Sequence, residues 1–129
     1  MQTMQVLNTD VIDAVDEATS HVGISNYGKI VVGDQGFEFI HQTNPDRYIQ
    51  IPWSEVDIAV ASVMLKGRWI PRFGIQTRHN GIYAFSSRHP KDVLRAVQKY
   101  IGADRVRYSL TFFQVIRRGI HAWAERPAK

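Results

Sequence analysis

The sequence predicts a mainly β fold: an antiparallel sheet or small barrel of six to seven strands capped by a helix, with an amphipathic helix at the C-terminus. Short apolar segments separated by turn residues recur between residues 29 and 85. The pair Asn80-Gly81 is a strong hairpin signal. After residue 86, the apolar residues recur with a helical period instead.

The first elements lead into a glycine-containing turn. Residues 11–20 fit either a strand or a helix, because valines alternate with polar residues while the alanines suit a helix. Residues 29–32 and 37–40 are β-rich and flank the turn 33–36, whose two glycines can adopt positive φ angles. These segments predict a hairpin.

The central part of the chain predicts further short strands. A turn at residues 44–46 precedes a strand at 48–51, which Pro52 ends. The most continuous apolar run, residues 56–64, is expected to be a central strand.

Two more strands are expected at residues 73–77 and 82–85, joined by Asn80-Gly81. Both of these turn residues tolerate the left-handed angles of a type I′ turn.

Two helices are expected to follow. Ser86 or Ser87 can cap the first, which has Pro90 in its first turn and Gly102 as its stop. Its apolar face consists of Val93, Leu94, Val97 and Ile101. The second helix is expected over residues 111–123, with an apolar stripe of Phe112, Ile116, Ile120 and Trp123.

The length of 129 residues predicts one domain over residues 1–129. Residues 11–102 are expected to form a β-rich body with its capping helix, and residues 103–129 a C-terminal helical extension. The absence of cysteine excludes disulfides, thiolate zinc sites and cysteine nucleophiles. The N-terminus does not resemble a secretory signal, and no apolar run reaches about 20 residues, so a cytoplasmic protein is expected.

Charge is distributed unevenly along the chain. Residues 1–64 hold two Lys+Arg against nine Asp+Glu, a net charge of −7, whereas residues 65–129 hold fourteen against three, a net charge of +11. The basic half could meet an anionic partner, or the two halves could fold against each other and largely cancel.

No catalytic motif is recognisable, so the protein is expected not to be an enzyme and to need no cofactor or metal. The sequence lacks a nucleophile elbow, a Walker loop and a dinucleotide-binding fingerprint. Its five histidines are scattered and do not pair at metal-ligand spacing; a phosphoacceptor role for one of them stays open, beside the simpler interpretation of surface loop residues.

The most suggestive segment for partner binding is residues 66–72. Here Lys66, Arg68 and Arg72 surround the indole of Trp69 in a loop between two strands. This arrangement can serve as a cationic hook with an aromatic anchor. The structural alternative is a solubilising hairpin tip whose Trp69 packs into the barrel.

The C-terminal segment is a second candidate binding site. Phe113, Arg117 and Arg118 belong to a basic amphipathic stretch that could lie on a membrane or dock in a partner's groove. The same pattern fits a helix packed on the core, or one that packs against its equivalent in a homo-oligomer. Nucleic-acid binding is not expected, because no recognition-module signature accompanies the basic residues.

Six segments in order carry a family resemblance: DEATS followed by Gly23, YGKIVVGDQGFEF, YIQIPWSEV, ASVMLKGRWIPR, YAFSS and SLTFFQVIRRG. Together they resemble the ManO-like family, a bacterial family of unknown function, over nearly the whole chain. The element order is similar to the pleckstrin-homology and GRAM architecture. The family resemblance implies a small cytoplasmic protein with a regulatory or accessory role beside mannose-class sugar phosphotransferase systems, and it supplies no catalytic residues.

The expected function is therefore a non-enzymatic regulatory or adaptor module that contacts a protein, expected to be a phosphotransferase component. The alternative is a peripheral module that binds anionic lipid through its basic residues. A DNA-binding regulator is a further, weaker alternative.

Overall fold

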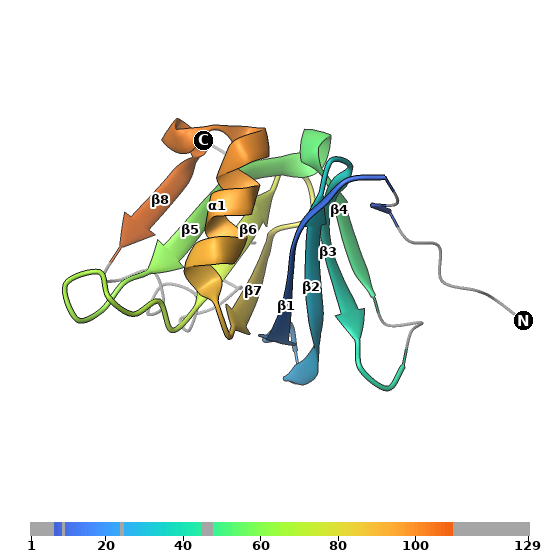
Figure 1. Ribbon diagram of the computed structural model, residues 1–129, viewed down its shortest axis with the longest axis horizontal. Helices are drawn as coiled ribbons and strands as arrows, with labels where there is room; N and C mark the ends of the chain where they lie inside the picture. Colours follow the sequence, from blue (N-terminus) through green and yellow to red (C-terminus); the bar gives the residue numbers. More distant parts are fainter. Residues whose placement is uncertain (1–6, 9, 24, 45–47, 110–129) are drawn as a thin grey trace, which may run out of the picture.

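The computed structural model describes residues 7–8, 10–23, 25–44 and 48–109 of the 129-residue chain (Figure 1). The described residues form β1 (Ile12–Ser20), β2 (Asn26–Gly33), β3 (Gly36–His41), β4 (Ile49–Pro52), the 3-10 turn η1 (Trp53–Glu55), β5 (Val56–Ser62), β6 (Phe73–Thr77), β7 (Ile82–Ser87), α1 (Pro90–Ile101), the 3-10 turn η2 (Ala103–Arg105) and β8 (Val106–Ser109).

The described strands form one sheet of eight, in the order β4-β3-β2-β1-β7-β6-β5-β8. Seven strands pair antiparallel, and β8 joins β5 in parallel. The mainly β fold with a packed helix is confirmed, but the expected six to seven strands are too few. The additional strand is β8, which comes from the segment assigned to a C-terminal helical extension.

The segment at residues 11–20, which fits either a strand or a helix by its sequence, forms the strand β1 from Ile12 to Ser20. The expected helix over residues 111–123 and most of the turn at 44–46 lie outside the described residues. No helix in the described part of the chain is long and apolar enough to cross a membrane.

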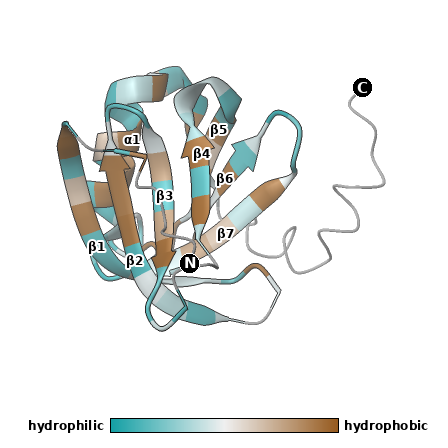
Figure 2. Ribbon diagram, turned by 90° about the vertical axis from the view of Figure 1, so that its right-hand side faces the viewer, coloured by the Kyte–Doolittle hydropathy of each residue, from teal (hydrophilic) through white to brown (hydrophobic). Residues whose placement is uncertain are grey.

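The core lies between α1 and the sheet. Four buried phenylalanines come from three strands: Phe37 and Phe39 from β3, Phe73 from β6 and Phe85 from β7. The Phe37 and Phe85 rings lie 5.1 Å apart. Val93, Leu94 and Val97 of α1 are almost completely buried against them, as the helical period predicts. Each such side chain contributes about 1.5–3 kcal/mol by leaving water. Figure 2 shows hydrophobic residues alternating with hydrophilic ones along the strands.

The start of α1 differs from the expectation. His89 occupies the N-cap position without a side-chain cap, so the prediction that Ser86 or Ser87 caps the helix is wrong. The Ser86 hydroxyl instead donates to the Pro71 carbonyl at 2.9 Å, because β7 extends through Ser87. The end at Gly102 is confirmed, with a φ of 93°.

Glycine is required at both ends of the β2–β3 turn because a side chain would not fit there, and not because the backbone adopts a positive φ angle. Neither Gly33 nor Gly36 has a positive φ. A Cβ on Gly33 would lie 2.2 Å from the Val11 carbonyl oxygen, and one on Gly36 would lie 2.3 Å from that of Ile51. The segment that leads into β1 therefore passes directly over this turn.

The β6–β7 hairpin is confirmed, but its connection is not a type I′ turn. Gly81 has a φ of 77°, whereas Asn80 has no positive φ. The Thr77 hydroxyl and backbone N–H both donate to the Gly81 carbonyl and close the loop.

Candidate partner-binding site

The connection between β5 and β6 forms a closed hairpin tip over residues 64–69. The Met64 N–H donates to the Trp69 carbonyl at 2.8 Å, and the Trp69 N–H donates back to Met64 at 3.2 Å. The Gly67 N–H also donates to the Met64 carbonyl, at 3.1 Å. These bonds give the tip a defined shape, although it projects from the sheet (Figure 1).

The tip contains three successive left-handed residues. Leu65 has a φ of 54°, Lys66 of 56° and Gly67 of 87°. Glycine adopts such angles freely, but leucine and lysine do so at a cost of about 1–2 kcal/mol each. Backbone strain of this kind concentrates at functional sites.

Apolar side chains of the tip are exposed. Leu65 is 68% exposed, Trp69 52% and Met64 48%. About half of the Trp69 side chain faces solvent, so it does not pack into the interior as the structural alternative predicts. The strand expected to run to Met64 ends at Ser62, so Met64 belongs to the tip.

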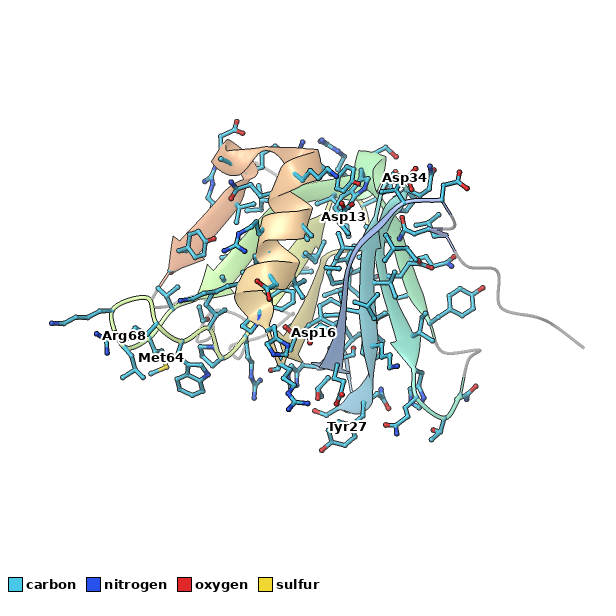
Figure 3. All side chains as sticks on the ribbon, viewed as in Figure 1. Asp13, Asp16, Tyr27, Asp34, Met64 and Arg68 are labelled. Carbon is cyan, nitrogen blue, oxygen red and sulfur yellow. The ribbon has the colours of Figure 1, made fainter. Side chains whose placement is uncertain are left out.

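The predicted cations divide into two groups. Lys66 and Arg68 are exposed on the tip, and no ion pair between described residues involves either of them. Figure 3 shows Arg68 at the outer end of the tip, near Met64. Arg72 lies at the base and is half-buried, and its carbonyl accepts from the Ser62 N–H at 2.9 Å. Phe113, Arg117 and Arg118 lie outside the described residues.

His21 lies close enough to Arg72 to sense its charge. Burial, and then the Arg72 charge, lower the pKa of His21 from its usual 6.5, so the ring is neutral near pH 7. Its Nε2 lies 2.7 Å from the Ser86 hydroxyl. Because that hydroxyl already donates to the Pro71 carbonyl, it accepts from His21, and the ring does not act as a base toward it.

The other described histidines also have assigned partners. Asn26 Oδ1 lies 3.1 Å from His41 Nε2, while backbone N–H groups of Thr43 and Asn44 donate to His41 Nδ1. His79 pairs with Glu55, and His89 with Asp16, both at 3.0 Å. Among the described residues, no three His, Cys, Asp or Glu side chains cluster as a metal site would need.

A groove of about 920 Å³ crosses the ends of β1, β2, β3 and β7. Its lining includes Tyr27, Lys29 and His41, and the Glu17 carboxylate pairs with Arg88 at 3.7 Å. These groups point to no single reaction, and the groove is open to solvent.

The sequence predicts the cationic segment but not the exposed apolar side chains of Met64 and Leu65, which form the aliphatic apex of the tip. The apolar run of residues 56–64 predicts that Met64 ends a core strand, whereas the structure places Met64 and Leu65 in the tip. The signal available in the sequence was Gly67, which breaks the apolar run two residues after Leu65.

Comparisons with known proteins place the chain in a family but not in a functional class. A family model described as a domain of unknown function (DUF956) matches residues 3–120. The search of curated proteins found no match. Among solved structures, the chain resembles the C-terminal domain of an unknown protein from Leishmania infantum, with a TM-score of 0.59 and 10% identity over 69% of this chain and 82% of that one. At this identity, the likeness shows the fold alone.

Proposed function

Because the chain belongs to DUF956, a family of domains of unknown function, we propose its role from its surfaces: a non-enzymatic regulatory or adaptor module that binds a protein partner through the hairpin tip, residues 64–69. The observation that carries the proposal is the exposure of Met64, Leu65 and Trp69 on a hydrogen-bonded, strained loop.

Three properties of the tip support protein contact. Large apolar and aromatic side chains dominate the energy of interfaces. A loop that is already closed by backbone hydrogen bonds loses little conformational entropy on binding. Lys66 and Arg68 can steer the tip toward an acidic surface.

The identity of the partner rests on the sequence resemblance to the ManO-like family. That resemblance supports a component of a mannose-type sugar phosphotransferase system and a cytoplasmic location. We also propose that the fold is pleckstrin-homology-like. Seven antiparallel strands followed by a helix support it, whereas the parallel strand β8 is an addition.

A second candidate is binding to an anionic lipid surface. The aliphatic apex at Met64 and Leu65 beside two exposed cations favours it, because apolar side chains can enter a bilayer interface while cations meet headgroups. Each cation near such a surface contributes about 1 kcal/mol.

The experiment that tests the proposal is binding of the full chain to individually purified phosphotransferase components, comparing wild type with Leu65→Asn and Arg68→Glu. Tyr27→Ser is the matched control, because Tyr27 is 70% exposed but lies on β2. Protein contact predicts that both tip variants lose about tenfold or more in affinity and that the control does not.

Vesicles containing phosphatidylglycerol separate the two candidates. Salt-sensitive sedimentation that Leu65→Asn abolishes, without binding to any protein component, would replace the protein partner by lipid. Equal binding of all variants to a component would keep the adaptor role but move the site away from the tip.

A further inference from the structure

A second apolar cluster lies on the face of the sheet opposite to α1. Side chains alternate between the two faces of a strand, and Ala61 of β5 and Phe85 of β7 belong to the core beneath α1. Val60 and Ile82 therefore point to the other face, where they form a separate cluster. Figure 1 shows α1 in front of the sheet, so this back face lies behind β5, β6 and β7. The back face includes Ile58 and Val60 of β5, Gln76 of β6, and Ile82 and Ala84 of β7.

The back face is almost inaccessible to water. Val60 is 8% exposed, and Ile82 and Ala84 are each 5% exposed. The Gln76 Oε1 atom, which lies between Ile58 and Ile82 in the strand register, is buried and has no hydrogen-bond partner among the described residues. On an open sheet face, such an atom would accept a hydrogen bond from water. The back face is therefore covered.

The described elements do not supply this cover. The described strands all belong to the sheet itself, and α1 packs against its opposite face. Among the described apolar residues, Ile58 packs on Val60 and Ile82, and it belongs to the same face. Gly74 lies between Val60 and Ala84 in the strand register, so no side chain fills the middle of the face. The cover comes from the rest of the chain or from another molecule.

The C-terminal segment, residues 110–129, begins beside these strands. It follows Ser109 at the end of β8, whose carbonyl accepts from the Val63 N–H at 3.1 Å just after β5. A helix over residues 111–123, as the sequence predicts, is about 20 Å long. The adjacent strands β8, β5, β6 and β7 span about 14 Å at the usual strand spacing. The segment is therefore long enough to cross all of them.

The composition of the C-terminal segment matches an apolar face that has to be covered. Large apolar residues share one stripe of its predicted helix: Phe112, Ile116, Ile120 and Trp123. Arg117 and Arg118 fall outside this stripe, because successive residues of a helix are rotated by about 100°. A helix that turns its stripe to the sheet thus keeps both cations in water.

We propose that the C-terminal segment packs across the back face, with its apolar stripe against Val60, Ile82 and Ala84. The sheet is then covered on both sides, by α1 and by this segment. The stripe belongs to the interior and is not available to a partner, whereas Arg117 and Arg118 face solvent. The proposal concerns a contact within the chain and does not depend on what the hairpin tip binds.

The absence of cysteine makes a single introduced thiol a specific reporter of this cover. Ala84→Cys places a thiol on the back face. Ala96→Cys places one in the core beneath α1, where Ala96 is 8% exposed. The rate of reaction with an aromatic disulfide reagent is measured in the full chain, and both thiols are expected to react slowly.

Ile116→Asp puts a charge into the stripe, and His121→Asp is the matched control on the opposite side of the predicted helix. Because a buried charge is unfavourable, Ile116→Asp is expected to displace the segment and to accelerate the reaction at Ala84→Cys about tenfold or more. The thiol of Ala96→Cys is expected to stay slow, which shows that the fold is retained. His121→Asp is expected to change neither rate.

A spin label provides a second measurement if Ile116→Asp unfolds the chain and exposes both thiols. A nitroxide attached to Gln114→Cys lies away from the stripe in the predicted helix and leaves the proposed contact intact. It is expected to broaden the NMR amide signals of Val60 and Ala84 more strongly than those of α1.

Three results would overturn the proposal: a fast reaction of Ala84→Cys in the otherwise wild-type chain, an unchanged rate at this thiol in the folded Ile116→Asp variant, or no broadening at the back face from Gln114→Cys. A reaction that accelerates on dilution, with broadening between separately labelled molecules, would assign the cover to a second copy of the chain instead.

Discussion

The carboxylate of Asp16 on β1 holds the residue that precedes α1. It accepts from the His89 backbone N–H at 2.5 Å, and its other oxygen lies 3.0 Å from His89 Nδ1. Because an ionised carboxylate only accepts hydrogen bonds, Nδ1 carries a proton. A side chain 73 residues away in the sequence thus takes the place of a local helix cap and puts a negative charge at the positive end of the helix dipole.

Replacing Asp16 by Ala is expected to lower the free energy of unfolding by about 1–2 kcal/mol, the usual cost of removing a cap from a helix N-terminus. Urea denaturation followed by circular dichroism measures the change. Glu17→Ala is the matched control: its exposed pair with Arg88 at 3.7 Å is expected to contribute under about 1 kcal/mol. Equal effects of the two substitutions would contradict the capping role.

The cluster of Asp13, Lys99 and Tyr100 predicts pH-dependent stability. Hydrogen bonds from Lys99 and then Tyr100 lower the pKa of Asp13 below 3.8. The contribution of this carboxylate is complete above pH 3.8 and is lost as the pH falls through its folded-state pKa. Asp13→Asn is therefore expected to flatten the acid limb of a plot of melting temperature against pH. An unchanged acid limb would show that other carboxylates control it.

The same cluster of Asp13, Lys99 and Tyr100 also loses its stabilising contribution as the pH rises into the alkaline range. The hydrogen bonds with Asp13 raise the pKa of Lys99 above 10.5 and that of Tyr100 above 10.0. Their contribution is complete below these values and is lost as the pH rises through the folded-state pKa values. Tyr100→Phe is expected to reduce the alkaline loss of melting temperature, because Phe has no hydroxyl to titrate. Phenylalanine retains the aromatic ring that stacks on Trp53, where the ring centroids of Trp53 and Tyr100 lie 5.0 Å apart. The substitution therefore removes the hydroxyl without removing the stacking contact.

Leu65→Asn is expected to raise stability while weakening partner binding. Asparagine tolerates a φ near 54° better than leucine, so the substitution relieves about 0.5–1 kcal/mol of backbone strain and removes an exposed apolar side chain. Thermal unfolding and the binding assay on the same sample test both effects. A less stable variant would mean that the Leu65 side chain supports the fold, and then lost binding would not identify a contact.

Asn8 is expected to be the strongest polar contributor at the β2–β3 turn. Its side chain accepts from the N–H groups of Gln35 and Gly36 at 2.7 and 3.0 Å, and donates to the Gly36 carbonyl and the Glu38 carboxylate, both at 2.9 Å. Asn8 and Glu38 are each 1% exposed. Asn8→Ala leaves several buried groups without partners and is expected to cost about 2–4 kcal/mol.

Urea denaturation measures the Asn8 effect, and limited proteolysis reports whether the chain before β1 becomes cleavable. Asn80→Ala, in the exposed β6–β7 turn, is the control and is expected to change stability by about 0.5 kcal/mol or less. Equal stability of the two variants would show that water replaces the Asn8 contacts.

The sequence predicts those elements whose formation depends on residues close together in the chain. The hairpin of β2 and β3, the strands β6 and β7, and α1 with its stop at Gly102 all follow from alternation, turn residues and helical period over a few residues. The cationic segment at Lys66 to Arg72 was also recognisable, because its residue types alone mark it. Its division into an exposed tip and a half-buried base depends on where β5 ends, and the apolar pattern extended past that point.

The sequence by itself determined a mainly β fold with a packed helix and a basic, aromatic loop, because periodicity and turn chemistry are local properties. Only the tertiary structure decided that β8 pairs in parallel with β5, that Asp16 caps α1, and that β2 is the only described strand that pairs with β1 at Val15. Each of these depends on groups distant in the chain that meet after collapse. These long-range contacts are stabilised by burial and by hydrogen bonds between segments, and the pattern of residues within either segment does not specify them.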